Sequence, residues 1–397
     1  MNELAALVAE RVGRRGPLPF DEVVDLALYH PERGFYGQGR GAGRRGDFIT
    51  SPEVGRLFGA VLARALDQWW ADLGRPDPYV VVEAGAGAGT LAAAVLAAAP
   101  ACGPALRYVL VERSEVLRRA QATRLPVEPA ASVLGPALGD DPDEGPRPHP
   151  GAGPLVGALA DLPVGPFAGV VVANELLDNM PFRLLQRTGF GYRAPALANR
   201  TQNEMGGWEE VRVGEDLSEV LVPADPGLAA QGDRWAPDAA PGARIPVQHA
   251  AGAWLRAALA CLRRGRVVVV DYADSTPSLA ARPWTEWVRT YRGHGRGGHP
   301  LADLGEQDVT CEVAVDQLGG ARPPAVDRSQ AAFLQAFGIA DLVSDARRIW
   351  HERAAIGDLA ALAARSRVGE ADALIDPAGL GAFRVLEWPV GRAGAGA

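Results

Sequence analysis

The chain has 397 residues and a formal net charge of −8, with 48% hydrophobic and 22% charged residues. This composition is typical of a folded globular protein with two domains, or with one large domain that carries an insertion. The acidic balance argues against a general nucleic-acid binder. Because all 40 basic residues are arginine, Schiff-base lysine chemistry and a P-loop lysine are excluded.

The spacing of the cysteines and the hydropathy of the chain exclude further classes of protein. Cys102, Cys261 and Cys311 lie far apart and form no CxxC pair, so we expect neither a metal site nor a disulfide framework. The N-terminal stretch MNELAALVAERVGRRG lacks the uncharged core of a signal peptide, and no apolar window is long enough to span a membrane. We expect a soluble cytoplasmic protein without a membrane partner.

Apolar spacing predicts the elements of the first half of the chain. Predicted helices lie at 2–12, 20–29, about 52–73 with Ser51 as a candidate cap, the stretch before Pro100, and 114–124. Predicted strands lie at 79–83, 107–112 and 169–173. A Gly-, Pro- and Arg-rich segment occupies 28–55, and we expect a loop over 130–154.

The second half resumes the alternation of strands and helices. Predicted strands lie at 266–271 and 383–388, and predicted helices at 250–263, 329–337 and 344–364. We expect short strands and loops without a strong helix over 183–245, and strand and loop structure over 284–320. Apolar strands that alternate with helices predict parallel βαβ units, and therefore an α/β fold with a doubly wound sheet.

This pattern divides the chain into four parts. They are an N-terminal helical and lid region at 1–78, a Rossmann-like cofactor-binding half at 79–182, an inserted substrate-shaping α+β region at 183–249, and the rest of the sheet at 250–397, with an insertion near 284–320.

A glycine-rich turn, Glu83-Ala-Gly85-Ala-Gly87-Ala-Gly89, directly follows a predicted strand and opens a helix. Glycines there permit close approach of a ligand to the backbone. The G-x-G-x-G spacing differs from the dinucleotide fingerprint, and Glu83 would repel a pyrophosphate but suit an ammonium and a sulfonium. Glu112 ends the next strand and can accept hydrogen bonds from ribose hydroxyls. These features favour S-adenosylmethionine (SAM) over NAD; the alternative is an ordinary turn in a Gly/Ala-rich chain.

Polar residues also follow the predicted strand at 169–173. Asn174, Glu175 and Asp178 come where open α/β sheets bind ligands, so we interpret them as catalytic candidates that hold or deprotonate a methyl acceptor. The alternative is a capped helix start, with Asn174 as the N-cap and Asp178 as ordinary helix polarity.

The loop Gly46-Asp47-Phe48-Ile49-Thr50 precedes the first predicted strand of the sheet. Its polar groups and its aromatic ring could fold over a cofactor as a lid. The alternative is an exposed loop that ends in a helix cap. The arginine-rich segment 282–296 could hold an acidic substrate or protein patch, but we favour a solvated face.

Taken together, three segments resemble the MidA-like family of SAM-dependent methyltransferases, which includes a mitochondrial complex I assembly arginine methyltransferase. They are LYHPERGFY with GDFITSPEVGRLFG, VVEAGAGAGTLAAAVL, and VVVANELLDNMPF. The later segments VVVVDYA, RTYRGHGRGGHPLADLGEQDVTCEVAVDQL and GLGAFRVLEW match as well. The resemblance covers about 20–388.

The resemblance implies a class I SAM-methyltransferase sheet with an N-terminal helical extension and an inserted substrate region. It implies an enzyme that uses SAM and methylates a protein, at an arginine nitrogen. Carried over by motif, the cofactor-binding residues are Gly46, Asp47, Phe48, Thr50, Glu83, Gly85, Gly87, Gly89, Glu112 and Asn174. The stretch 125–160 departs from the family pattern, so no motif places the adenine contact, and we assign it to Asp161 and Leu162. The catalytic set is Glu175, Asp178 and Asn174.

The sequence alone does not decide which chemical group accepts the methyl. A guanidinium would be oriented by Glu175 and Asp178, with Asp47 or Glu53 as lid-side partners, because carboxylates bind it through paired hydrogen bonds. A hydroxyl acceptor would favour a histidine base, for which the candidates are His30, His249, His294 and His299. The alternatives are therefore a small-molecule O- or N-methyltransferase and a SAM-binding assembly factor without turnover. A homodimer is compatible with all of these.

Overall fold

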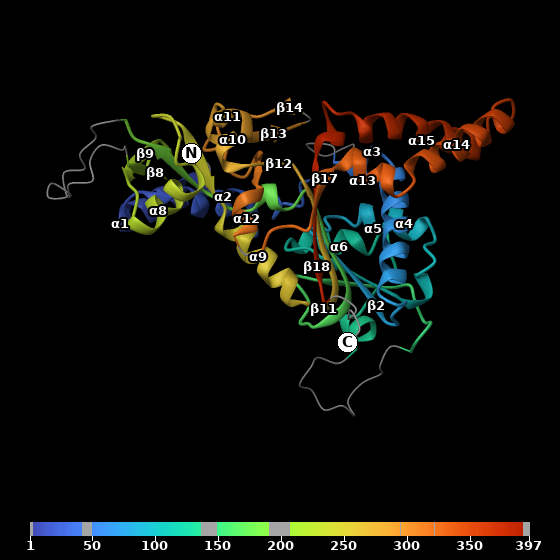
Figure 1. The fold of residues 1–397 in the computed structure, drawn as a ribbon. Coiled ribbons are helices and arrows are strands. Elements are labelled where there is room, and N and C mark those ends of the chain that lie inside the picture. The colour runs from blue at the N-terminus through green and yellow to red at the C-terminus, as the bar shows by residue number, and fades with distance from the viewer. Residues whose placement is uncertain are drawn as a thin grey trace, which may run out of the picture. The chain divides into compact units, whose positions relative to one another are not determined.

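A computed structural model describes residues 3–41, 50–135, 149–189, 207–293, 295–320 and 322–391. The chain divides into two compact units (Figure 1). Unit 1 comprises Met1–Gly41, Leu177–Trp254 and Ala273–Pro323, and unit 2 comprises Ala42–Leu176, Leu255–Tyr272 and Pro324–Ala397. Each unit is therefore assembled from three separate stretches of the chain.

Unit 2 is built on an eight-stranded, mostly parallel sheet with the strand order β17-β18-β11-β6-β2-β3-β5-β4. The strands are β17 (Val326–Ser329), β18 (Arg384–Val390), β11 (Leu262–Asp271), β6 (Phe167–Asn174), β2 (Tyr79–Ala84), β3 (Leu106–Val111), β5 (Leu155–Leu159) and β4 (Val127–Glu128). β11 to β4 run parallel, whereas β18 is antiparallel to both of its neighbours. The expected α/β fold with a mostly parallel sheet is confirmed.

The helices of unit 2 are α3 (Ser51–Val54), α4 (Leu57–Asp72), α5 (Thr90–Ala97), α6 (Glu115–Gln121), α7 (Ala130–Leu134), α13 (Gln330–Ala336), α14 (Ile339–Arg353) and α15 (Leu359–Ile375), while α9 (His249–Ala260) crosses the unit boundary. A short 3-10 turn, η1 (Gly103–Ala105), precedes β3, and another, η4 (Leu380–Ala382), precedes β18.

Two predicted helices of unit 2 are wrong in their extent. The helix expected over 52–73 is interrupted at Gly55, where a side chain would overlap the Glu370 carboxylate, which accepts the Leu57 N–H at 2.9 Å. The helix expected over 344–364 is two helices, because Gly357 has a left-handed φ of 65° and Asp358 caps α15 through the Ala361 N–H.

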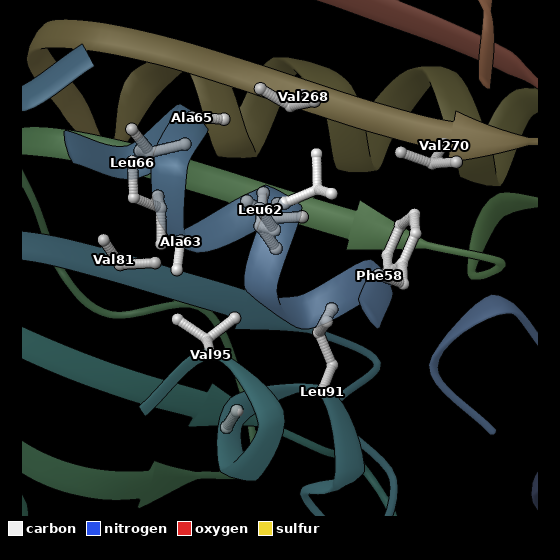
Figure 2. Packing of buried hydrophobic residues seen from close by; sticks show 14 of the residues in the cluster. Phe58, Leu62, Ala63, Ala65, Leu66, Val81, Leu91, Val95, Val268 and Val270 are labelled. Carbon is white, nitrogen blue, oxygen red and sulfur yellow. The ribbon is translucent and has the colours of Figure 1, made fainter. Parts of the chain in front are cut away.

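The core of unit 2 lies where α4 and α5 cover the sheet (Figure 2). Side chains of these two helices meet valines of β2 and β11 in one buried cluster, which includes Phe58, Leu62, Leu66, Val81, Leu91, Val95, Val268 and Val270. Val-rich strands suit this position because parallel strands are buried on both faces. The same cluster includes Val170 and Val172 of β6, so this packing fixes β2 and β6, the strands that carry two of the candidate motifs.

Unit 1 contains a smaller antiparallel sheet with the order β1-β8-β7-β10, in which β9 also pairs with β8. The strands are β1 (Leu18–Pro19), β8 (Trp208–Val213), β7 (Arg183–Arg187), β10 (Arg244–Val247) and β9 (Glu219–Pro223). The expectation that 183–245 holds no strong helix is wrong, since α8 (Pro226–Trp235) lies there. Its start is fixed by Pro226 and by the Asp225 side chain, which accepts two backbone N–H groups.

The remaining elements of unit 1 are short, apart from its two N-terminal helices. They are α1 (Glu3–Arg15), α2 (Phe20–Tyr29), η2 (Leu177–Asn179), β12 (Ala273–Asp274), α10 (Thr276–Ala280), α11 (Trp284–Trp287), β13 (Val288–Arg292), β14 (Gly295–Arg296), β15 (Asp308–Cys311), β16 (Val313–Ala314) and α12 (Val315–Gly319). Within the described part of the chain, no helix is both long and apolar enough to cross a membrane.

Two Leu→Ala substitutions test the core. Leu62 is 2% exposed, whereas the Leu359 residue is 84% exposed. We expect Leu62→Ala to lower the free energy of unfolding by about 2–5 kcal/mol because it leaves a cavity, and Leu359→Ala to change it by less than about 0.5 kcal/mol. Urea denaturation measures both, and equal effects would contradict the packing in Figure 2.

Candidate functional site

The glycine turn between β2 and α5 has left-handed φ angles of 71° at Gly85, 52° at Gly87 and 81° at Gly89. A Cβ added to Gly85 would lie 2.9 Å from Leu176 Cδ1, so the Leu176 side chain would have to move, and the left-handed φ adds strain for any other residue. A Cβ added to Gly87 would meet no atom of the described residues within 4 Å. Gly87 therefore offers its backbone to open space, as a turn that admits a ligand must do.

Glu112 follows β3 and reaches this turn. Its side chain is buried, with 8% of the residue exposed. Oε2 accepts the Gly87 N–H at 2.9 Å, and Oε1 accepts the Ser114 N–H at 2.8 Å. Burial raises the pKa of the carboxyl group, and these backbone donors oppose the rise. A carboxylate offers about four acceptor positions, so Glu112 is held in place and retains capacity for the two hydroxyls of a ribose.

Glu83, the acid of the glycine motif, has different hydrogen-bond partners from Glu112. It is 4% exposed, and its Oε2 accepts the Tyr108 hydroxyl at 2.6 Å. Burial raises its pKa to about 7, which the hydrogen bonds from Tyr108 and from the Ala92 backbone partly oppose. The side chain thus joins β2 to β3 and to the first turn of α5. Its expected pairing with a ligand's positive charge stays a prediction.

The end of β6 combines an unusual backbone with an unsatisfied acceptor. Glu175 has a left-handed φ of 51°, although it is not glycine, and its Oε1 accepts the Ser51 N–H at 3.0 Å and Asn174 Nδ2 at 3.1 Å. Such strain of roughly 1–3 kcal/mol is typical of ligand sites. Asn174 Oδ1 is buried without a hydrogen-bond partner among the described residues. This oxygen fits a cationic or amine donor.

The helix-cap explanation of Asn174 is wrong for the described chain. No α-helix begins there, because β6 ends at Asn174 and only the 3-10 turn η2 follows. Ser51, a candidate cap in the sequence, donates its backbone N–H to Glu175 and its hydroxyl to Gln330 Oε1 at 3.0 Å. The start of α3 is thereby attached to the end of β6.

Asp178 belongs to unit 1 and to a buried polar cluster there. The neighbouring Asn179 donates from Nδ2 to Asp308 Oδ1 at 2.9 Å, and Tyr36 Oη donates to the same oxygen at 3.1 Å. Tyr29 Oη donates to the Asn179 carbonyl at 3.1 Å. The pKa of Tyr36 is raised, first by burial and then by the charge of Asp308, with a further contribution from Asp178.

Sequence reasoning assigned no role to three members of this cluster, Tyr36, Asn179 and Asp308. All three lie inside the segments that carry the family resemblance, and that is the signal by which they could have been found. Their proximity could not be read from the sequence, since 272 positions separate Tyr36 from Asp308.

The structure describes three of the remaining predicted cofactor residues, Thr50, Asp161 and Leu162. Gly46, Asp47 and Phe48 lie outside the described residues, whereas Thr50 is buried and immediately precedes α3. Asp161 is exposed and Leu162 is half-buried; both follow β5, the neighbour of β3 in the sheet. Their position one strand beyond Glu112 is compatible with the predicted adenine contact.

The histidine candidates that are described all lie in unit 1 and have local partners. His30 Nδ1 accepts the backbone N–H groups of Glu32 and Arg33, His249 bonds to Gln231, and His299 contacts Glu219. His294 lies outside the described residues. Among the described residues, no group of three or more His, Cys, Asp or Glu side chains could hold a metal ion.

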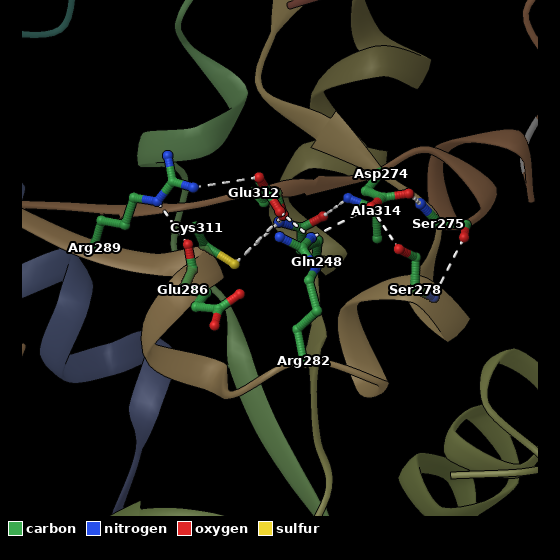
Figure 3. Close-up of polar contacts among 10 residues, drawn as sticks. All are labelled: Gln248, Asp274, Ser275, Ser278, Arg282, Glu286, Arg289, Cys311, Glu312 and Ala314. Atoms are coloured by element: carbon green, nitrogen blue, oxygen red, sulfur yellow. Dashed lines mark hydrogen bonds and ion pairs between the residues drawn. The ribbon is translucent and has the colours of Figure 1, made fainter. Parts of the chain in front are cut away.

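The arginine-rich segment of unit 1 is bound to acidic side chains and carbonyl groups (Figure 3). Arg282 pairs with Asp274 and Glu312, and Arg289 pairs with Glu312 at 3.6 Å and donates to the Glu286 carbonyl. Gln248 links this group to β15 and β16 through the carbonyl of Glu312 and the N–H of Ala314. These contacts favour a structural role for this segment.

A family model of S-adenosyl-L-methionine-dependent methyltransferases matches residues 61–323. The chain belongs to this family. The MidA-like resemblance of the sequence is thereby confirmed, and the cofactor of the family is SAM.

Solved structures support the family assignment. A crystal structure of a COG1565 superfamily member from Burkholderia thailandensis, bound to S-adenosyl-homocysteine, is 28% identical to this chain. It has a TM-score of 0.73 and covers 99% of this chain and 93% of that one. A native crystal structure of a COG1565 superfamily protein from the same organism is also 28% identical to this chain. It has a TM-score of 0.73 and covers 99% of this chain and 92% of that one.

Curated relatives match over a shorter range. The protein arginine methyltransferase NDUFAF7 homolog of Drosophila melanogaster is 32% identical, and human NDUFAF7, a mitochondrial protein arginine methyltransferase, is 29% identical. Each match covers 46% of this chain and 42% of the relative, so the chain spans less than half the length of these proteins.

The residues of this methyltransferase fit the family's cofactor. The open position at Gly87, the anchored carboxylate of Glu112 and the unsatisfied Oδ1 of Asn174 supply close backbone approach, acceptors for a diol and an acceptor for an ammonium. All three lie in unit 2, at the ends of β2, β3 and β6, which are adjacent parallel strands. This is the position where open α/β sheets bind nucleotides.

Substitution of Gly87 by alanine tests the cofactor turn. Gly87 and Gly74 both have left-handed φ angles, and an added Cβ meets no described atom within 4 Å at either position. We expect both alanine variants to lose about 1–2 kcal/mol of stability. Only Gly87→Ala should weaken SAM binding by about tenfold or more, because its methyl group occupies the ligand's space. Calorimetry with Gly74→Ala as control measures this, and equal affinities would remove Gly87 from the site.

The buried carboxyl of Glu83 should make stability depend on pH. Its pKa is raised from 4.5 unfolded to about 7 folded, so the folded state binds the proton more tightly. The contribution is complete below pH 4.5 and is lost as the pH rises through 7, by up to about 3 kcal/mol. We expect Glu83→Gln to flatten the pH profile of unfolding free energy, whereas Glu115→Gln, at an exposed site, should leave the slope unchanged. An unaltered slope in Glu83→Gln would contradict the assigned burial.

Proposed function

We propose that this protein transfers the methyl group of SAM to an arginine nitrogen of a protein acceptor. The observation that carries the cofactor half of the proposal is the Glu112 carboxylate, which backbone N–H groups hold beside the open Gly87. The sheet order, with antiparallel β18 between β11 and β17, supports the class I methyltransferase form of the fold.

In this proposal each residue has a distinct task. When bound, SAM would supply a methyl group that the acceptor nitrogen attacks in line, so that the N–C bond forms as the C–S bond breaks and S-adenosyl-homocysteine leaves. Glu112 accepts the ribose hydroxyls, Gly87 allows close approach, and Asn174 Oδ1 accepts a hydrogen bond from the cofactor's ammonium. Glu175 and Asp178 are the candidates for orienting the acceptor and receiving its proton, since a guanidinium loses a proton only as the new bond forms.

Two observations support a cationic protein acceptor. The residues of unit 1 include 23 of the 48 acidic but only 17 of the 40 basic residues, so this unit carries most of the net negative charge. A net negative charge attracts an arginine-bearing partner and raises its association rate. In addition, the curated relatives from fly and human are named protein arginine methyltransferases.

Isotope transfer tests the acceptor class. The protein is incubated with SAM that carries a heavy methyl group and with a lysate of its source cells, and proteins and metabolites are then analysed separately by mass spectrometry. We expect the label on arginine residues of protein. Label confined to metabolites would establish a small-molecule methyltransferase, and no label with intact SAM binding would establish an assembly factor without turnover.

Asp178→Asn tests the acceptor side of the site. Loss of the charge should reduce the turnover rate by about 100-fold or more, because proton acceptance by a positioned group contributes about that factor. The affinity for SAM should not change. Asp216→Asn, at a fully exposed position, is the matched control. Full activity of Asp178→Asn on the identified acceptor would remove Asp178 from the catalytic set.

A further inference from the structure

Gln121, the last residue of α6, holds the cofactor turn from a side that the family motifs do not include. The residue is 0% exposed. Its Nε2 donates to the Gly87 carbonyl oxygen at 2.8 Å, while the Gly87 N–H donates to Glu112 Oε2 at 2.9 Å. The two peptide groups on either side of the Gly87 Cα are therefore both fixed by buried side chains.

The amide of Gln121 is poorly explained by packing alone. Its Oε1 is buried without a hydrogen-bond partner in the described chain, and a buried unsatisfied acceptor lowers stability. An apolar side chain of similar length would avoid that penalty. The amide cannot be turned over either, because Oε1 would then face the Gly87 carbonyl oxygen, and two acceptors repel. What the amide provides is a donor to Gly87.

A donor at this position matters because of the conformation of Gly87. Glycine loses more conformational freedom than any other residue when it is fixed, and Gly87 has open space where a side chain would be. A turn that is fixed before the ligand arrives does not need to be ordered on binding, so the affinity is higher.

We propose that Gln121 is a positioning residue for the cofactor, which preorganises the Gly87 peptides and, through them, the carboxylate of Glu112. The proposal rests on the proposed function, because it assumes that SAM occupies this turn. Gln121 acts through Gly87 and is not itself assigned a contact with the ligand.

Gln121→Met tests the proposal because it keeps the length of the side chain and removes the donor. The full chain is titrated calorimetrically with S-adenosyl-homocysteine. We expect the affinity to fall about tenfold, the order of effect of one well-placed hydrogen bond, with no loss of thermal stability. Gln68→Met is the control, since Gln68 is an exposed glutamine of α4 whose Nε2 donates to Asp72 Oδ1 at 2.9 Å. This variant should bind the ligand as the wild type does.

A second variant, Gln121→Glu, gives a readout that a purely structural role would not produce. An ionised carboxylate cannot donate to the Gly87 carbonyl, but a protonated one can, and burial favours the protonated form. Affinity relative to the wild type should therefore recover as the pH is lowered from about 8 to about 5. Gln121→Met should show no such recovery.

The outcomes separate this inference from the proposed function. Wild-type affinity in a folded Gln121→Met variant, or a Gln121→Glu affinity that follows the wild type at every pH, would overturn the role of Gln121 while SAM binding stands. Failure of the wild-type protein to bind S-adenosyl-homocysteine would overturn the proposed function instead. Circular dichroism verifies folding, and Gln121→Leu repeats the comparison if the methionine variant does not fold.

Discussion

The hydrogen bond from the Gly87 backbone to the Glu112 carboxylate is the contact on which the proposed cofactor site depends. It joins the glycine turn after β2 to the acid after β3, two neighbouring parallel strands, and so sets the distance between the two parts of the proposed site. The same bond, with that from Ser114, opposes the rise that burial causes in the pKa of the Glu112 carboxyl group.

Two acids at the ends of adjacent strands have different environments and hence different roles. Glu83 is bound by Tyr108 and by the start of α5, and its pKa is near 7. Among the described residues, Glu112 is bound by backbone N–H groups and lies near the charge of Arg118, beside the open Gly87. The structure thus favours Glu112 for ligand binding and Glu83 for support of the turn. In unit 1, Asp178 lies in a separate cluster with tyrosines and Asp308.

The sequence predicted the parallel strands β2, β3, β6 and β11 and the glycine turn, because each is a local pattern of valines or glycines, but it did not predict β4 and β5. It missed the break between α14 and α15, since helical spacing continues on both sides of Gly357, and it missed α8, whose start depends on one Asp–Pro pair. Contacts between residues that lie far apart in the chain could not be predicted from the sequence. The bonds from Ser51 to Glu175 and from Tyr36 to Asp308 join residues 124 and 272 positions apart, which no local pattern records.

A crystal structure of this protein with S-adenosyl-homocysteine tests the central claim most directly. The account predicts both ribose hydroxyls within hydrogen-bond distance of the Glu112 carboxylate, with the ligand passing over the open side of Gly87. A ligand bound away from these residues, or a sugar held by Glu83 while Glu112 keeps only its backbone partners, would contradict it.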